Sequence, residues 1–317
     1  MKSSKDVATR RYPSHLFALY LDAIPHGLAR IDSTQAKKAQ TVLEATLRDI
    51  VPISQQLELH LHDLLFLLHQ VSGCFATLCF QETWTRKEAG LAGINILINI
   101  PDIGEKWTSV RDFDLTRTLL HLIKDLPHEA PRNALNVINT LTRILRISLQ
   151  LAPPPELGVQ PQPQNKATYM VSVFLAELSS AHPIVRKAAQ TCIGLISEIS
   201  GKSLYDLLRP HRDRALTALF TKPLRALPHP IIIGQVEAVR YCVSMDPPLP
   251  ELSEELLRLL HETLALADME DSQLVARSNV RQSLIEMVHL RVAVVRLLTA
   301  SMPLTDFFAK QPQTRSR

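Results

Sequence analysis

The stretch "HPIVRKAAQTCIGLISEISGKSLYD", residues 182–206, carries the pattern that decides the fold. Its apolar residues recur at the three- and four-residue spacing of a helix, and on that helix they form one broad stripe: Ile184, Val185, Ala188, Ala189, Cys192, Ile193, Ile196 and Ile199. Such a stripe faces a core while the opposite side faces water. The order Pro-x-Val-Arg-x-Ala-Ala is found at the start of many second helices of HEAT repeats, and "TRKEAGLAGINIL" at residues 85–97 is a weaker copy.

The tripeptide Gly201-Lys202-Ser203 in this stretch matches the end of a nucleotide-binding phosphate loop. The full loop requires Gly-x-x-x-x-Gly-Lys-Ser/Thr after a buried strand, because a run of backbone N–H groups must wrap the phosphates. Ile196 stands where the first glycine belongs, and the preceding residues have helical spacing. We therefore predict a helix–helix corner, in which Gly201 is left-handed and Ser203, with Asp206 three residues later, caps the next helix.

Segments of the same kind recur along the chain. Thr85 with Glu88 has the Ser/Thr-x-x-acid form of another helix start. No segment alternates convincingly like a strand, and helical spacing is found at residues 14–24, 34–50, 54–71, 74–80, 84–99, 111–126, 133–151, 168–180, 183–200, 204–219, 230–245, 253–268 and 281–301. Helices joined by short corners are typical of an α-solenoid, and at about 40–47 residues per HEAT pair the chain holds roughly seven pairs. The sequence therefore predicts an all-α solenoid of HEAT-like helix pairs.

The composition agrees with packed helices. Apolar residues make up 46% of the 317 residues and aromatic ones only 5%, while the 21 prolines gather between apolar runs, where they interrupt helices. Four scattered cysteines are too few for a disulfide framework in a chain of this length, which indicates a reducing compartment. The N-terminal residues lack the apolar core and cleavage site of a secretory signal.

One segment interrupts the helical pattern. Residues 152–166, "APPPELGVQPQPQNK", are rich in proline and glutamine and contain almost no large apolar residues. Such a segment cannot bury enough surface to fold alone, so we expect a loop. A proline-rich ligand for aromatic grooves is the alternative. The loop would separate two blocks of HEAT-like repeats, residues 1–151 and 167–317, of which the second continues the first.

A search for catalytic and metal-binding patterns yields weak candidates. His60, His62, His69, Cys74 and Cys79 are possible zinc ligands, but positions 60 and 62 point to different faces of a helix and the cysteines lack C-x-x-C spacing. No Gly-x-Ser-x-Gly, His-Glu-x-x-His or Gly-x-Gly-x-x-Gly motif occurs. The sequence therefore predicts a chain without catalytic residue, cofactor or metal, and not an enzyme.

Residues 64–81, "LLFLLHQVSGCFATLCFQ", carry no formal charge over a length near the lower limit for crossing a bilayer. His69, Gln70, Ser72 and Gly73 lie in the middle of this stretch. These polar and small residues favour a buried helix, and we predict no membrane association.

Charge is unevenly distributed, although the net charge of +4 is mild and predicts no direct binding of nucleic acid. Residues 201–240 hold seven basic and three acidic side chains, whereas residues 251–272 hold one basic and seven acidic ones. These blocks are either solvated faces or the lining of a groove that selects partners by charge. The candidate partner-binding residues are Arg209, Arg212, Arg214, Lys222 and Arg225.

Long irregular corners make the sequence resemble a known family. The segments that carry the resemblance are "RKEAGLAGINILINIPDIGEKW" (86–107), "DLTRTLLHLIKDLPHEAPR" (114–132), "GKSLYDLLRPHRDRALTALFTKPLRALPHPIIIGQVEAVRYCVSMDPPLPELSEELLRLLHETLALAD" (201–268) and "LTASMPLTDFF" (298–308). In this order they resemble the TRRAP family of transcription-associated scaffold proteins, the catalytically inactive members of the phosphatidylinositol-kinase-related kinases. The resemblance covers about residues 83–310.

The resemblance implies a function that the residues alone do not show. Members of that family are large nuclear scaffolds of HEAT and related repeats in histone acetyltransferase coactivator complexes such as SAGA, and they receive the activation domains of transcription factors. It implies that this chain is an internal HEAT segment, nuclear, with coactivator complex subunits and acidic activation domains as partners. It has neither the later repeats nor the kinase-like domain of the family. An unrelated HEAT adaptor, such as a nuclear transport or phosphatase scaffold, is the alternative.

Overall fold

The structure is a computed structural model, and it describes residues 23–30, 32–56, 58, 61–126, 131–151, 166–220, 223–270, 272 and 284–309. Every regular element in these ranges is a helix, which confirms the all-α prediction. The chain forms two compact units, Met1–Pro161 and Gln162–Arg317, each of which is described by itself. The predicted loop lies almost wholly outside the described residues. That the second block of repeats continues the first stays a prediction.

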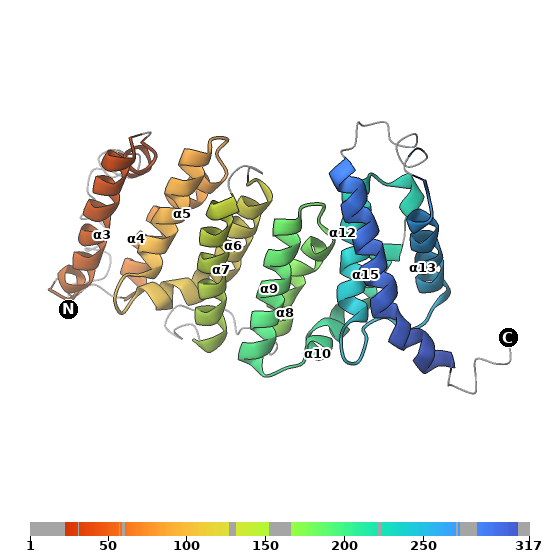
Figure 1. Cartoon of the computed structure of the whole chain (residues 1–317). Coiled ribbons are helices and arrows are strands. Elements are labelled where there is room, and N and C mark those ends of the chain that lie inside the picture. Colours follow the sequence, from red (N-terminus) through yellow and green to blue (C-terminus); the bar gives the residue numbers. More distant parts are fainter. Residues whose placement is uncertain are drawn as a thin grey trace. The chain divides into compact units, whose positions relative to one another are not determined.

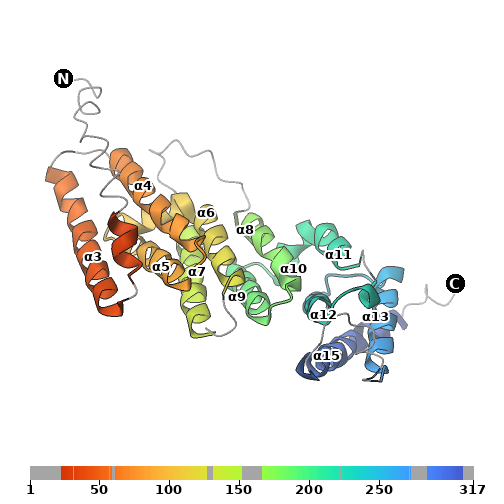
Figure 2. The same cartoon turned by 90° about the horizontal axis from the view of Figure 1, so that it is seen from above.

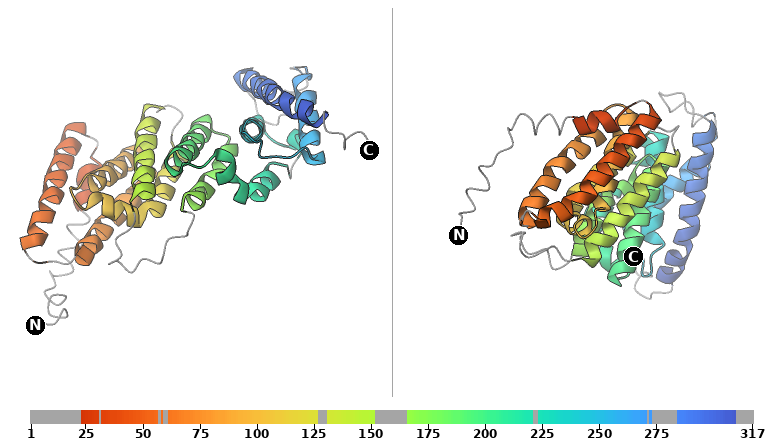
Figure 3. Two further views of the ribbon diagram at one scale, coloured as in Figure 1. Left: turned by 90° about the horizontal axis from the view of Figure 1, so that it is seen from below. Right: turned by 90° about the vertical axis from the view of Figure 1, so that its left-hand side faces the viewer.

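The N-terminal unit is a stack of long helices. They are α3 (Ser33–Gln56), α4 (Leu61–Cys79), α5 (Trp84–Ile98), α6 (Gly104–Lys124) and α7 (Pro131–Gln150), and residues 23–28 before them are also helical. The helix α4 packs on α5, and α6 packs on α7. Figures 1 and 2 show two layers, with α3, α5 and α7 along one side and α4 and α6 along the other. In the right-hand view of Figure 3 this unit is seen from its α3 side.

The contact between α4 and α5 is unusually close. A Cβ atom added to Gly93 would lie 2.3 Å from a ring carbon of Phe75, so a side chain at this position would collide with the aromatic ring. Phe75 is fully buried, as are Leu68 and Ile94. The stretch with the weaker HEAT-like pattern, residues 85–97, therefore forms a core helix.

Several predicted helix limits in this unit are wrong. The helix α3 continues past Pro52 to Gln56, and α4 runs without a break through residues 72 and 73. The Ser72 hydroxyl donates a hydrogen bond of 2.8 Å to the carbonyl oxygen of His69 in the same helix, so this polar residue fits within the buried helix. The predicted segment 14–24 lies almost wholly outside the described residues.

The start of α6 was also predicted too late, at residue 111 instead of Gly104. Its first turns contain buried Thr108 and Ser109, whose hydroxyls donate to the carbonyl oxygens of Gly104 and Lys106 at 2.7 and 2.8 Å. Because the helix itself satisfies these hydroxyls, they can be buried beside Trp107, and the apolar spacing that marks a helix is hidden there.

The C-terminal unit contains shorter elements and two longer helices. Its elements are α8 (Lys166–Phe174), η2 (Leu175–Ser179), α9 (Pro183–Ser200), α10 (Leu204–Leu208), η3 (Arg209–His211), α11 (Arg212–Phe220), η4 (Leu224–Ala226), α12 (His229–Val243), α13 (Glu254–Ala267) and α15 (Leu284–Ala309). The helix α9 packs on α8 and η2, and α12 packs on η2 and α15. Figure 2 shows α12 nearly end-on with α15 beside it.

The corner after α9 has the predicted geometry. Gly201 has a left-handed φ of 63°, and the Ser203 hydroxyl accepts a hydrogen bond of 3.1 Å from the Asp206 backbone N–H. Lys202 is exposed. The analogous prediction for Thr85 is wrong, because α5 begins at Trp84 after Thr83, whose side chain makes no capping hydrogen bond.

Two apolar stretches differ in their surroundings. The stretch 64–81 lies mainly in α4, which packs on α5 and α6 as a buried helix. By length and composition, the stretch Ile285–Leu304 of α15 could cross a membrane, and 39% of it is buried in the unit. There α15 packs on α12 and α13, so its apolar residues serve partly as core.

Candidate functional site

The basic segment, residues 201–240, lies on consecutive elements that begin at the Gly201 corner. Arg209 opens η3, and Arg212 and Arg214 lie in the first turn of α11. Arg209 and Arg214 are exposed, whereas Arg212 is about one-third exposed. Lys222 and the side chain of Arg225 lie outside the described part of the structure. Three of the five candidate arginines and lysines can therefore be placed, and they lie within six residues of one another.

The acidic segment, residues 251–272, contacts the basic segment through α13. Arg212 forms an ion pair of 3.0 Å with Glu251, and the helices α11 and α13 are in contact. Glu262 accepts a hydrogen bond of 2.6 Å from the Leu224 backbone N–H, while Arg258 donates one of 2.5 Å to the carbonyl oxygen of Phe220. Part of the charge of each segment is therefore used within the unit. Arg209 and Arg214 are the candidate residues that remain exposed for a partner.

The histidine and cysteine candidates do not form a metal site in the described residues, where no group of three or more His, Cys, Asp or Glu side chains could hold an ion. His60 and the side chain of His62 lie outside the described part. Burial lowers the pKa of His69 below 6.5, with a smaller contribution from Arg111. Burial raises the pKa of the Cys79 thiol to about 12, so this side chain stays protonated at neutral pH.

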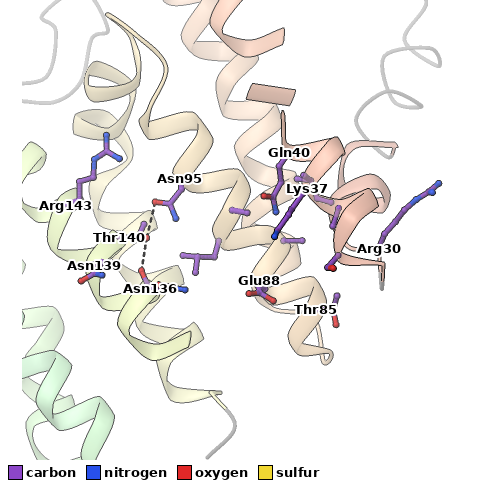
Figure 4. Close-up of a pocket in the computed structure, with 16 residues that line it drawn as sticks. Arg30, Lys37, Gln40, Thr85, Glu88, Asn95, Asn136, Asn139, Thr140 and Arg143 are labelled. Atoms are coloured by element: carbon purple, nitrogen blue, oxygen red, sulfur yellow. Dashed lines mark hydrogen bonds between the residues drawn. The ribbon is translucent and has the colours of Figure 1, made fainter. Parts of the chain in front are cut away.

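The N-terminal unit contains a cleft that the sequence did not indicate. It has a volume of about 720 Å³ and is lined mainly by residues of α3, α5 and α7. Its polar lining includes Ser33, Lys37 and Gln40 of α3, Thr85, Glu88 and Asn95 of α5, and Asn136, Asn139, Thr140 and Arg143 of α7, together with Arg30. Figure 4 labels most of these side chains and shows that, apart from Arg30, they come from three helices, α3, α5 and α7.

One hydrogen-bonded group joins two walls of the cleft. The hydroxyl oxygen of the buried Thr140 lies 3.0 Å from Asn95 Oδ1 and 3.0 Å from the carbonyl oxygen of Asn136. This hydrogen bond links α5 to α7 within the lining of the cleft (Figure 4). The polar residues of α7 at positions 136, 139, 140 and 143 have the spacing of one helix face. This spacing could have indicated a polar face of α7, but it does not show that α3 and α5 supply the other walls of the cleft.

Comparison with known proteins identifies the chain. A family model described as the Tra1 HEAT repeat ring region matches residues 2–317. The chain belongs to this family. The predicted solenoid of HEAT-like repeats and the resemblance to the TRRAP family are thereby confirmed.

Relatives of the chain, which we call the ring segment because residues 2–317 match the ring-region model, carry consistent names. The chain is 33% identical over 246 residues to the "SAGA complex/NuA4 acetyltransferase complex subunit Tra1" of Schizosaccharomyces pombe. The aligned residues cover 77% of the chain and 7% of that protein. Identity to the protein of the same name from Saccharomyces cerevisiae is 32% over 241 residues, or 75% of the chain and 6% of that protein. The human "Transformation/transcription domain-associated protein" is 24% identical to the chain over 230 residues, which are 70% of the chain and 6% of that protein. The ring segment thus spans less than a tenth of these relatives.

Proposed function

We propose that the ring segment is a non-catalytic scaffold element of a histone acetyltransferase coactivator complex of the SAGA or NuA4 type. The observation that supports this proposal is the family match over residues 2–317, together with relatives whose names place them in those two complexes. A nuclear location and protein partners from such a complex belong to the same proposal. Stacked helix pairs suit this role because they present long rows of side chains to a partner.

We further propose that the exposed arginines of the C-terminal unit contribute to binding of acidic activation domains. Such segments are acidic and dotted with apolar residues, so they can pair their carboxylates with Arg209, Arg212 and Arg214. The affinity is expected to be about micromolar or weaker, because a disordered ligand must become ordered on contact. The interaction does not require direct contact with nucleic acid.

Purification of the tagged chain from nuclear extract, followed by quantitative mass spectrometry, tests the scaffold proposal. We expect enrichment of acetyltransferase complex subunits over an unrelated HEAT-repeat protein used as bait. Enrichment of nuclear transport factors or phosphatase subunits instead would contradict it.

Titration of a labelled acidic activator peptide, followed by fluorescence anisotropy, tests the finer proposal. Binding should weaken with added salt and with simultaneous reversal of Arg209, Arg212 and Arg214 to glutamate. If binding is insensitive to both changes, the peptide binds to another surface and the proposed site is wrong.

A further inference from the structure

The cleft of the N-terminal unit offers side-chain amides that are available to a ligand. Asn136 and Asn139 are exposed, and within the described residues their side-chain amides form no hydrogen bond; the hydroxyls of Thr140 and Thr142 bond to the backbone carbonyl oxygens of these two residues. A carboxamide presents an acceptor oxygen and two donor hydrogens, so it can pair with both the N–H and the C=O of a peptide backbone. Asn95 lies beside them and is held by its contact with Thr140. The cleft therefore presents carboxamides from α5 and α7 that can form hydrogen bonds with the backbone of a bound peptide.

Positive charge lies toward the ends of the same cleft. Lys37 and Arg143 form no ion pair within the described part of the chain, and Arg30 donates a hydrogen bond to Gln35. Glu88 is the acidic residue of the lining, so the described lining carries three cations and one carboxylate. Figure 4 places Arg143 at one end of the cleft and Lys37 and Arg30 toward the other. This distribution favours a ligand with negative charge toward both ends.

The dimensions fit a short extended chain. A path across three neighbouring helices, with spacings of about 8–10 Å, is matched by roughly six residues in extended conformation at about 3.3 Å each. The volume of about 720 Å³ is in the range of sites that enclose a ligand. None of the described lining residues is aromatic, which disfavours single-stranded nucleic acid, because its binding depends on stacking of bases.

We propose that this cleft binds an extended acidic peptide segment of a partner protein. The side-chain amides of Asn95, Asn136 and Asn139 hold its backbone, and Lys37 and Arg143 pair with its carboxylates. The site lies in the N-terminal unit and uses none of the arginines assigned to activation domains above. It therefore stands or fails independently of the proposed function.

The test uses the full chain and labelled peptides of about seven residues with glutamate at both ends and alanine or serine between them. Fluorescence anisotropy should give a Kd of roughly tens to hundreds of micromolar, as expected for a short flexible ligand. A peptide with lysine in place of both glutamates should bind at least about tenfold more weakly. A glutamate peptide whose internal amides are N-methylated should also bind with at least about tenfold lower affinity, because its backbone cannot donate hydrogen bonds to the carboxamides.

Matched variants localise the binding. Lys37→Glu and Arg143→Glu should each weaken it about tenfold. Lys38→Glu and Arg146→Glu make the same charge change on the same helices, at exposed positions that do not line the cleft, and should change affinity less than about twofold. Asn139→Ala should weaken binding while preserving the preference for glutamate over lysine. Reversal of Arg209, Arg212 and Arg214 should leave this binding unchanged, which separates the two proposals.

Several outcomes would overturn the inference. These are absence of binding by the glutamate peptide at millimolar concentration, equal binding of the lysine or N-methylated peptide, and equal effects of the cleft variants and their controls. A single-stranded oligonucleotide that binds more tightly than the glutamate peptide, with the same dependence on Lys37 and Arg143, would assign the cleft to a different class of ligand and would also overturn it.

Discussion

The guanidinium of Arg212 lies 3.0 Å from the carboxylate of Glu251, and this contact joins the basic and acidic segments of the C-terminal unit. The Arg212 side chain is 33% exposed and that of Glu251 is 77% exposed, so water screens the pair. Ion pairs of this kind contribute about 0–1 kcal/mol to stability. The contact also has a functional consequence, because Glu251 competes with any acidic ligand for one of the three arginines that the proposal assigns to activation domains.

We expect Glu251→Gln to strengthen binding of an acidic activator peptide by about two- to threefold, because Arg212 loses its competitor. The free energy of unfolding should change by less than about 0.5 kcal/mol. Anisotropy titration and urea denaturation measure the two effects. Glu254→Gln is the control, since this exposed carboxylate forms no ion pair within the described residues. Unchanged or weaker binding after Glu251→Gln would indicate that Arg212 does not belong to the site.

The core stripe of α9 predicts a severe effect of a buried charge. Val185 is 1% exposed, so Val185→Asp places a carboxylate in an apolar environment and should lower the free energy of unfolding by about 4 kcal/mol or more. Lys202→Ala, at the exposed corner, should change it by no more than about 0.5 kcal/mol. Chemical denaturation followed by circular dichroism measures both. Near-normal stability of the aspartate variant would mean that this face of α9 is not core.

The sequence predicts helices best where apolar spacing and corner chemistry agree. The helix α9 was predicted at its observed limits, because one unbroken stripe ends at Gly201 and Ser203. The start of α6 was missed because buried Thr108 and Ser109 satisfy their hydroxyls inside the helix and so interrupt the apolar pattern. Polar residues can occupy a core when the helix itself accepts their hydrogen bonds, and a hydrophobic pattern cannot reveal them.

The candidate sites illustrate a different limit. Arg209, Arg212 and Arg214 could be found from local charge, since they are close in sequence. The ion pair of Arg212 with Glu251 joins residues 39 positions apart, and the cleft combines three helices whose side chains meet only after stacking. Such contacts depend on how helices pack, which the periodicity of a single segment does not specify.

A buried polar contact should hold α6 against α7. The Ser148 hydroxyl donates a hydrogen bond of 2.5 Å to Asp112, and both residues are buried. Ser148→Ala removes this donor from a buried carboxylate and should cost about 1–3 kcal/mol of unfolding free energy. Thr41→Ala, which deletes an exposed hydroxyl bonded to its own helix, should cost less than about 0.5 kcal/mol. Equal losses in the two variants in urea denaturation would argue against a structural role of the buried pair.

Thiol reactivity should distinguish the four cysteines. Burial raises the pKa of Cys79, Cys192 and Cys242 to about 12, whereas Cys74 is only partly buried. Because the thiolate is the reactive form, the native chain should react rapidly with a disulfide reagent at Cys74 and slowly at the other three. Spectrophotometric titration before and after denaturation measures this, and Cys74→Ser should abolish the rapid phase. A rapid phase of the same size in that variant would refute the assignment.

Acid should loosen the C-terminal unit through His229 at the start of α12. This residue is 6% exposed, and burial lowers its pKa below 6.5, although Glu286 partly opposes the shift. In the unfolded chain the imidazole titrates near its ordinary pKa, so below that value the unfolded state takes up a proton that the folded state resists. The stability contribution is therefore fully present above about pH 6.5 and is lost as the pH falls through the lower pKa of the folded state.

Hydrogen exchange of the α12 amides, compared at about pH 7.5 and about pH 5.5 after correction for the intrinsic exchange rate, measures this loss locally. The local readout matters because His69, in the N-terminal unit, has a pKa lowered by burial in the same way and would contribute to any global measurement. His229→Gln removes the titrating group while keeping a polar side chain, and should reduce the acid-induced loss of protection in α12. An equal loss in the variant and the unmodified chain would show that His229 does not cause it.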